Sequence, residues 1–538
     1  MKFLIPSIAG IAAVVLGGCM VGPDYHPPKT KLPDAFHEVM PVQPAGAGQV
    51  VTASESLENW WTVFQDPTLD SLMARALQNN RDLKQAISRI RQARAERAVV
   101  AGELLPEIDA TAGYNRALGS RNVQIPLSAL GASSAGGGSG ASASPGGTTG
   151  TRAGPRAEDA GGGNSPAPAA TPSGPLGGPT SPFGEGGLPG VTTNLYQVGF
   201  DASWELDIFG GEKRAMQAAD ADLAAARDGA RALRVSLLAE IASYYIQLRS
   251  NQQQAAIARR DLEAQRQTYA IDRDKFQSGL GNESPMEQQA AQMRTTEAMV
   301  PALEGAIRTT EHELAFLLGE DPDALSRELE TPGNWPAIPP AIPIGVPSEL
   351  LRRRPDVRQA ERDLAAATAN VGVATAQLFP QFSLTGSFGL DSSDVKHLPE
   401  WSSHYYSIAP GIRWPLLDWT RLHAAIRVQD ELQDQALFAY QTAVAQALKD
   451  VEDGLVQYQN ERVRRSALAE AVVADRKALQ VAEQTYSSGL ADQLSALSAE
   501  GQLLQVEDAL AQCDASLRTD LVALYKALGG GWKIAGPG

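Results

Sequence analysis

The chain contains 538 residues, with 46 Lys and Arg against 62 Asp and Glu, and its formal net charge is -16 at pH 7. This acidic balance argues against a nucleic-acid-binding protein, because phosphate recognition normally needs a basic surface. The chain has only two cysteines, Cys19 and Cys513, which excludes a disulfide framework and a cysteine-based structural zinc site.

The amino terminus has the features of a bacterial export signal. Lys2 precedes a short apolar stretch at 3–16, and a box with two small glycines then ends in Cys19. We predict a lipoprotein signal peptide at 1–18 and a covalent lipid on Cys19, the alternative being an ordinary secretory signal with an incidental cysteine. The following sequence has no apolar run long enough for a transmembrane helix, so a membrane crossing would need strands.

The chain contains a tandem internal repeat. Matching segments recur at an offset of 210 residues: Trp204 with Trp414, Phe276–Leu280 with Tyr486–Leu490, and Leu318-Gly319 with Leu528-Gly529. Upstream, Asp82–Ala86 matches Asp356–Ala360 at an offset of 274, so the first copy carries 64 additional residues. Residues 119–190 are almost entirely Gly, Ser, Ala, Pro and Thr, a composition that predicts a disordered loop.

Apolar and polar residues alternate on both sides of that insertion and at the matching places of the second copy. The apolar positions are Ile108, Ala110, Ala112 and Tyr114; Tyr196, Val198, Phe200, Ala202, Trp204 and Leu206; Phe382, Leu384, Gly386, Phe388 and Leu390; and Tyr406, Ile408, Pro410, Ile412 and Trp414. The pattern predicts two hairpins of roughly ten residues per strand, typical of a membrane β-barrel. A water-soluble antiparallel sheet with one buried face would show the same alternation, but the lipoprotein signal favours the membrane.

Most of the remaining chain has helical periodicity. Prolines are absent from 190–284 and from 416–536, and apolar residues recur every three or four positions. We predict long helices at 212–278 and 419–486, the first with about 67 residues and a length of about 100 Å. Shorter helices are predicted at 82–104, 286–318, 356–378 and 493–528, stacked end to end beside the long ones.

These elements divide the chain into the signal peptide, an N-terminal equatorial segment at 19–80, a first repeat at 81–320, a proline-rich extended connector at 321–354, a second repeat at 355–530 and a tail at 531–538. Four strands cannot close a barrel, so the chain must oligomerise to span a membrane. Two copies would give eight strands with a filled interior, and three would give twelve with an aqueous lumen.

Three sequence blocks together carry a resemblance to a known family: Cys19-Met-Val-Gly-Pro-Asp-Tyr-His-Pro-Pro; Trp60-Trp61 with Phe64-Gln-Asp-Pro-Thr-Leu69; and Leu351-Arg-Arg-Arg-Pro-Asp-Val-Arg-Gln-Ala-Glu361. The chain resembles the TolC-like outer-membrane efflux family in its lipoprotein (NodT/OprM-type) branch, over nearly the whole mature chain except the insertion.

The resemblance implies an α+β membrane protein, in which each chain of a homotrimer contributes four strands to a 12-strand β-barrel and long antiparallel coiled-coil helices to a periplasmic tunnel. The implied function is that of the outer-membrane channel of a tripartite efflux pump, which passively conducts small molecules from periplasm to exterior. The implied partners are a periplasmic adaptor (membrane fusion) protein and an inner-membrane RND-type transporter. An exit duct for protein secretion or a structural coiled-coil envelope lipoprotein are the alternatives.

The resemblance also assigns candidate sites. Adaptor docking is expected at the helix tips, at Gly279, Leu280, Gly489 and Leu490, where the simpler interpretation is a plain helical turn. Some relatives have an aspartate ring nine residues after the second tip glycine, but Ser498 occupies that position here and Gln288 its repeat mate. The candidate residues of the periplasmic aperture are Asp492, Ser495, Ser498, Glu500, Glu283 and Glu287.

Enzymatic chemistry finds little support in the sequence. His397 and His404 are seven residues apart in a predicted loop, without the spacing of a metal-binding motif, and Cys513 lies among leucines where a buried small residue is expected. We therefore predict no enzyme, no metal and no cofactor other than the lipid. Helices enter and leave both hairpins at the same end, so we expect that end to face the periplasm and the insertion to project from the cell surface.

Overall fold

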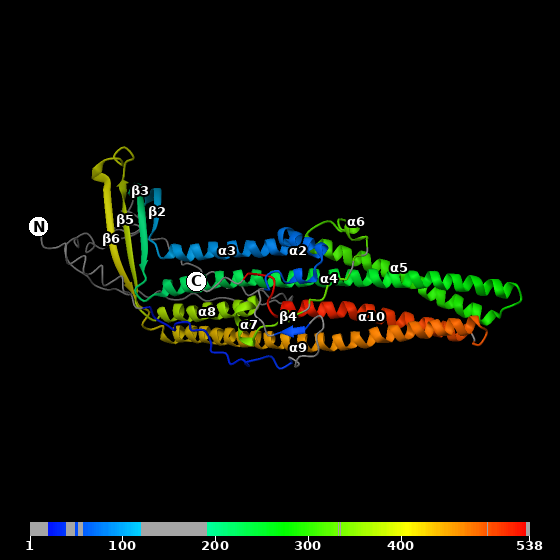
Figure 1. Ribbon diagram of the computed structural model, residues 1–538. Coiled ribbons are helices and arrows are strands. Elements are labelled where there is room, and N and C mark those ends of the chain that lie inside the picture. The colour runs from blue at the N-terminus through cyan, green and yellow to red at the C-terminus, as the bar shows by residue number, and fades with distance from the viewer. Residues whose placement is uncertain are drawn as a thin grey trace, which may run out of the picture. The chain divides into compact units, whose positions relative to one another are not determined.

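Two helices of unusual length, α4 (Gly211–Gln277, 67 residues) and α9 (Trp419–Ser487, 69 residues), extend through the helical part of the chain (Figure 1). The structure is a computed structural model, and it describes residues 20–38, 49–51, 57–119, 191–331, 333, 335–339, 341–491 and 493–533. Cys19, Asp492 and residues 120–190 of the predicted insertion therefore lie outside the described residues. Two compact units are present: a helical unit (1–105, 205–382 and 412–538) and a strand unit (106–204 and 383–411).

Shorter helices flank the two long ones, as the sequence predicts. α3 (Arg81–Glu103) and α5 (Glu283–Leu318) pack along α4, while α8 (Pro355–Ala376) and α10 (Gln493–Ala527) pack along α9 (Figure 1). α4 also contacts α8 and α10, which joins the two repeats. None of the described helices combines the length and the apolar character that a membrane crossing requires.

The start of α4 illustrates how the sequence fixes a helix boundary. Gly210 precedes the helix with φ of 77°, a left-handed conformation that glycine adopts readily. The carboxylate of Asp207 accepts hydrogen bonds from the backbone N–H groups of Glu212 (3.3 Å) and Lys213 (3.0 Å). These bonds satisfy two donors of the first turn that have no partner inside the helix.

Several short elements escape sequence prediction. They are η1 (Trp60–Phe64), α2 (Pro67–Asn79), α6 (Ser326–Leu329), α7 (Pro347–Arg353), and the parallel pair β1 (Gln49–Val51) and β4 (Ala341–Pro343). The expectation that the whole connector at 321–354 is extended is therefore wrong. Pro347 occupies the first turn of α7, where its fixed φ suits a helix and its missing N–H costs nothing. Pro285 likewise lies in the first turn of α5, which begins three residues before the predicted start.

The four strands form one antiparallel sheet, in which the two predicted hairpins lie side by side. β2 (Glu107–Leu118), β3 (Thr192–Leu206), β5 (Gln381–Ser392) and β6 (His404–Arg413) lie in the order β2-β3-β5-β6. β3, with 15 residues, is longer than the roughly ten predicted. β2 and β6 are the edges of this sheet within one chain.

The main hydrophobic core lies where the two repeats, the N-terminal segment and the connector meet. Trp60 stacks on Tyr525 of α10 with ring centroids 5.3 Å apart, and Tyr245 and Tyr458 of the long helices are fully buried. At the carboxyl end, the Nε1–H of Trp532 donates to the carbonyl of Arg353 at 3.0 Å. The described tail is thus packed into the helical unit.

Candidate functional site

The hairpin of α4 and α5 ends in a glycine-containing cap. Gly279 has φ of 74° and donates its N–H to the carbonyl of Phe276 at 3.0 Å, while the N–H of Leu280 donates to the carbonyl of Lys275 at 2.8 Å. This is the Schellman arrangement, which satisfies carbonyl groups at the helix end. A Cβ at Gly279 would meet nothing within 4 Å, so the position needs glycine for its backbone conformation and not for packing.

The hairpin of α9 and α10 repeats this geometry. Gly489 has φ of 72° and donates to the carbonyl of Tyr486 at 2.9 Å, and Leu490 donates to that of Thr485 at 2.9 Å. Leu280 and Leu490 are each 83% exposed. Each tip therefore presents a leucine that contributes almost nothing to the packing of its own chain.

The same cap recurs at Gly319 and Gly529, at the other ends of the shorter helices, but in a packed environment. A Cβ at Gly319 would lie 2.8 Å from the carbonyl oxygen of Asn79, and one at Gly529 would lie 2.7 Å from that of Arg353. The motif alone thus marks a helix end. The exposure of Leu280 and Leu490, which the sequence does not reveal, distinguishes the two tips from these packed helix ends.

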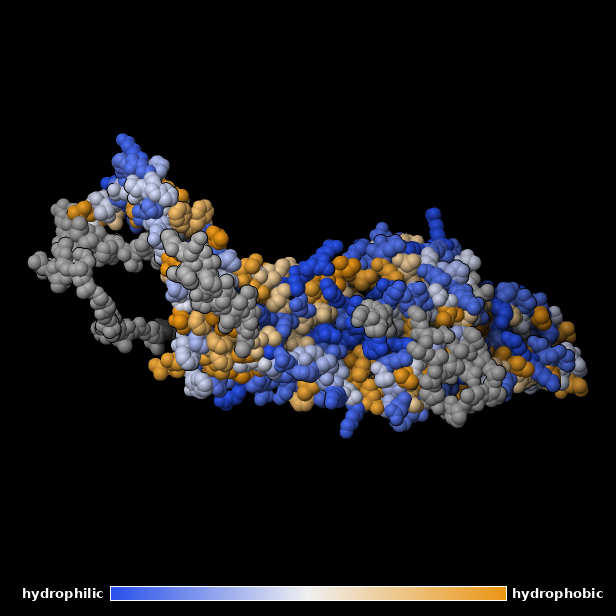
Figure 2. Space-filling view, turned by 60° about the vertical axis from the view of Figure 1, so that its left-hand side comes forward, coloured by the Kyte–Doolittle hydropathy of each residue, from blue (hydrophilic) through white to orange (hydrophobic). Residues whose placement is uncertain are grey.

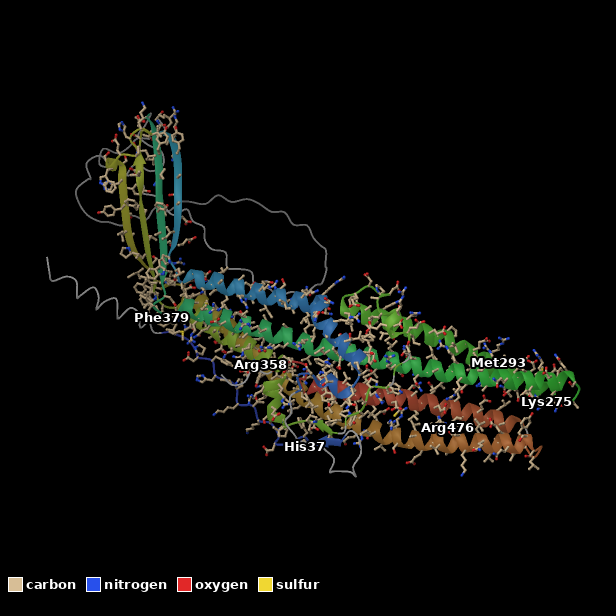
Figure 3. All side chains as sticks on the ribbon, turned by 45° about the horizontal axis from the view of Figure 1, so that its top comes forward. His37, Lys275, Met293, Arg358, Phe379 and Arg476 are labelled. Carbon is tan, nitrogen blue, oxygen red and sulfur yellow. The ribbon has the colours of Figure 1, made fainter. Side chains whose placement is uncertain are left out.

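The two tips are linked to each other. Lys275 lies at the end of α4, where Figure 3 labels it. Its Nζ donates to the hydroxyl of Tyr486 at 3.0 Å and lies 5.0 Å from the centroid of the Tyr486 ring. This hydrogen bond raises the pKa of Lys275 above its ordinary value. A charged contact therefore joins the tips of the two helical hairpins, one from each repeat.

The candidate aperture residues occupy different environments. Ser495 and Ser498 are exposed on α10, and Glu283 and Glu287 are exposed on α5. Asp492, the remaining candidate close to the second tip, is outside the described residues. These exposed side chains have the solvated character expected of a helix surface.

Glu500 differs from those candidates because it is half-buried between helices. Burial, together with Asp261 of α4 and Glu483 of α9, raises the pKa of Glu500 to about 7. The Oδ2 atom of Asp261 is itself buried and has no hydrogen-bond partner among the described residues. Sequence reasoning named Glu500 but missed its two acidic neighbours, because only helix packing brings these three distant segments together.

An Arg–Glu pair recurs in both hairpins at the repeat offset. Arg266 lies 3.1 Å from Glu297 in the first hairpin, and Arg476 lies 2.7 Å from Glu507 in the second (Figure 3 labels Arg476). Glu507 also contacts Arg260 of α4, which ties the two hairpins together. Burial alone would raise the pKa of Glu507, but hydrogen bonds from both arginines hold it below its ordinary value.

The sheet has one apolar and one polar face, as the alternation predicts. β2 and β3 pair in a register that places Tyr114 opposite Tyr196, and their rings stack at 4.7 Å. On the other face, the hydroxyl of Thr111 donates to Asp201 at 3.0 Å. Tyr406, Ile408 and Ile412 of β6 are each more than 70% exposed. Figure 2 shows hydrophilic side chains at the free end of the strands.

Reactive groups do not gather in the described part of the chain. It contains no set of three or more His, Cys, Asp or Glu placed to hold a metal ion. Cys513 is fully buried, and burial raises the pKa of its thiol to about 12, so it is a small core residue and not a nucleophile. His397 pairs with Glu400 at 2.8 Å at the exposed end of the β5–β6 hairpin.

Comparison with known proteins agrees with this architecture. The family model for outer membrane efflux proteins matches residues 171–320 and 346–530. Nodulation protein T from Rhizobium leguminosarum bv. viciae is 28% identical over 533 residues, covering 98% of this chain and 95% of its own. The pyoverdine export outer membrane protein OpmQ from Pseudomonas putida is 30% identical over 508 residues, covering 93% and 94%.

A solved structure of the outer-membrane channel OprN is also similar. It is 33% identical, with a TM-score of 0.77, and the match covers 96% of this chain and all of OprN's chain. The first family match covers the later part of the first repeat and ends at the same residue, 320, and the second match contains the whole second repeat. The similarity to the OprN channel extends over nearly the whole length of the chain. The chain belongs to the outer membrane efflux protein family, and it is an outer-membrane channel of an efflux pump.

Proposed function

We propose that three copies of the chain assemble into a twelve-strand barrel and a helical tunnel, through which small molecules pass passively from the periplasm to the exterior. The observation that carries this proposal is the open sheet. β2 and β6 are free edges in one chain, and an unpaired edge inside a membrane would leave backbone groups without hydrogen bonds. Pairing β6 of one copy with β2 of the next removes every edge, and twelve strands leave an aqueous lumen where eight would not.

The exposed tips support the proposed pump partners. A periplasmic adaptor, held in turn by an inner-membrane RND-type transporter, would dock at Gly279, Leu280, Gly489 and Leu490. Exposed apolar side chains on a rigid helix end are suitable anchors for such a contact. The capped, glycine-containing turns keep the two leucines in a fixed position.

Lipid on Cys19 would hold the amino terminus at the periplasmic side of the outer membrane. The first described residues support this placement, because the N–H of Val21 donates to the carbonyl of Phe209 at 3.1 Å, shortly after β3 ends. The side chain of Arg214 then donates to the carbonyls of Val21 (3.0 Å) and Gly22 (3.1 Å). The amino-terminal segment is thus fastened beside the start of α4.

Trimer formation and conduction can be tested together. Unheated protein should migrate in gels as a trimer that dissociates on boiling, and purified trimers should give discrete conductance steps in planar bilayers. A chain that stays monomeric in outer-membrane extracts, or trimers that carry no current, would contradict the proposal. A structural lipoprotein would form trimers that carry no current.

Replacing Cys19 with serine is expected to abolish acylation and leave the fold intact, because neither the strands nor the helical packing depends on the lipid. Metabolic labelling with palmitate, followed by gel migration of the trimer, measures both effects. Label that persists in the Cys19→Ser protein would rule out this lipid site.

The aperture is expected to be less acidic than one lined by an aspartate ring. Ser498→Asp places one additional carboxylate on the exposed surface of α10 in each chain, so three carboxylates would surround the axis of the trimer. Clustered carboxylates attract cations, so divalent ions should then reduce the current. Gln288→Asp, at the repeat mate, serves as the matched variant. Currents unchanged by Ser498→Asp, with and without divalent cations, would show that Ser498 does not line the constriction.

A further inference from the structure

One face of the strand unit holds a tyrosine ring over two glycines. Gly199 of β3 and Gly389 of β5 are buried, and they are the only buried residues that the structure describes in the four strands. A Cβ at Gly389 would lie 2.9 Å from Cε1 of Tyr405 and 2.8 Å from Cα of Gly199, and a Cβ at Gly199 would lie 3.0 Å from the Tyr405 hydroxyl. The ring of Tyr405 thus occupies space that a side chain at either position would need. The two glycines also let β3 and β5 approach closely, since a Cβ at Gly389 would lie 2.6 Å from the carbonyl oxygen of Val198.

A hydrogen bond fixes the far end of this ring. The Nε2–H of Gln197 donates to the Tyr405 hydroxyl at 2.7 Å. Gln197 belongs to β3 and Tyr405 to β6, with β5 lying between them, so the side chain extends across a whole strand. Gln197 and Gly199 are two residues apart and therefore share one face of the sheet.

The next residue, Tyr406, indicates which face of the sheet carries Tyr405. Tyr406 points to the opposite side because side chains alternate along a strand, and it is 73% exposed, as is Ile408. In a membrane barrel the apolar face meets lipid, so the face that carries Tyr405 lines the lumen. This step rests on the trimeric barrel of the proposed function.

The arrangement of Tyr405 over two glycines occurs in only one way in the chain's repeat, because the corresponding positions of the other copy hold different residues. At the offset of 210 residues, Tyr405 corresponds to Leu195 and Gly199 to Ala409. The described strands of each chain therefore hold one such ring, and a trimer would have three at one level of its lumen. Tyr405 is the second residue of β6, next to the β5–β6 loop, which places that level at the outer mouth.

We propose that Tyr405 is a positioning residue of the conduction path, held flat against the lumen wall by Gln197 and the two glycines so that the outer mouth stays wide. Released from this hydrogen bond, the ring can rotate toward the axis and narrow the passage. A purely structural role, in which the ring only clamps the strands together, would change the stability of the sheet but not the current.

Single-channel conductance of reconstituted trimers separates these roles. Gln197→Met removes the donor at nearly constant side-chain volume, and loss of one hydrogen bond should raise the ratio of released to seated rings about fivefold. The mean conductance should fall below wild type. Tyr405→Phe loses the same hydrogen bond and should also lower the mean conductance. In the double variant Gln197→Met/Tyr405→Ala no ring remains to rotate, so conductance should return to the wild-type value or exceed it.

Tyr406→Ala is the matched control, because it removes a neighbouring tyrosine from the lipid-facing side and should leave the conductance unchanged. Wild-type conductance in both Gln197→Met and Tyr405→Phe would overturn the proposal, as would a lowered conductance in the double variant. Absence of any current from wild-type trimers would instead contradict the proposed function itself.

Discussion

Changing both tip leucines to aspartate, in the variant Leu280→Asp/Leu490→Asp, is expected to abolish efflux in cells while leaving a folded, conducting trimer. Each leucine is 83% exposed, so its replacement removes almost no contact within the chain. Burying a leucine against a partner is worth about 2 kcal/mol, which corresponds to about thirtyfold in adaptor affinity for each tip. An introduced carboxylate adds the cost of burying a charge at the interface.

The measurement combines cross-linking to the adaptor, an export assay and planar-bilayer conductance. Leu280→Met/Leu490→Met keeps an apolar side chain at both tips and should retain adaptor binding and export. Adaptor cross-linking at the wild-type level in the aspartate variant would contradict docking through these leucines.

The long elements could be predicted from the sequence because their signals are local. An absence of proline together with apolar spacing of three and four residues predicts α4 within a residue at each end. Alternation over seven to eleven residues likewise predicts all four strands, and the repeat offset supports each prediction a second time. Such patterns are averaged over many positions, so a single exception such as Pro301 inside α5 does not disturb them.

Short elements and non-local contacts could not be predicted in this way. α7 has only seven residues, too few to show a helical period, and it begins at the last proline of the proline-rich connector. The surroundings of Glu500 depend on contacts among three helices whose residues lie far apart in the sequence. The place of Tyr405 depends on glycines in two other strands, and no periodic signal reports that arrangement.

Glu500→Gln is expected to stabilise the helical unit above neutral pH and to have no effect in acid. Burial beside Asp261 and Glu483 raises the pKa of Glu500 from 4.5 to about 7, so the folded protein favours the protonated form. The stability that this proton contributes is complete below pH 4.5 and is lost as pH rises through about 7. Ionised Glu500 would then repel both neighbours across the contact among α4, α9 and α10.

Glutamine retains the shape of the protonated carboxyl group and cannot ionise, so the variant should keep its low-pH stability at all pH values. After allowance for solvent screening at this half-buried site, the gain at pH 8 should be about 1–2 kcal/mol per chain. Thermal unfolding of the detergent-solubilised protein between pH 5 and pH 8 measures the difference. Glu287→Gln removes the same charge at an exposed position of the first helical hairpin, and it should leave the thermal unfolding unchanged at both pH values. If the unfolding temperatures of wild type and Glu500→Gln change with pH in the same way, Glu500 does not carry this proton in the assembled channel.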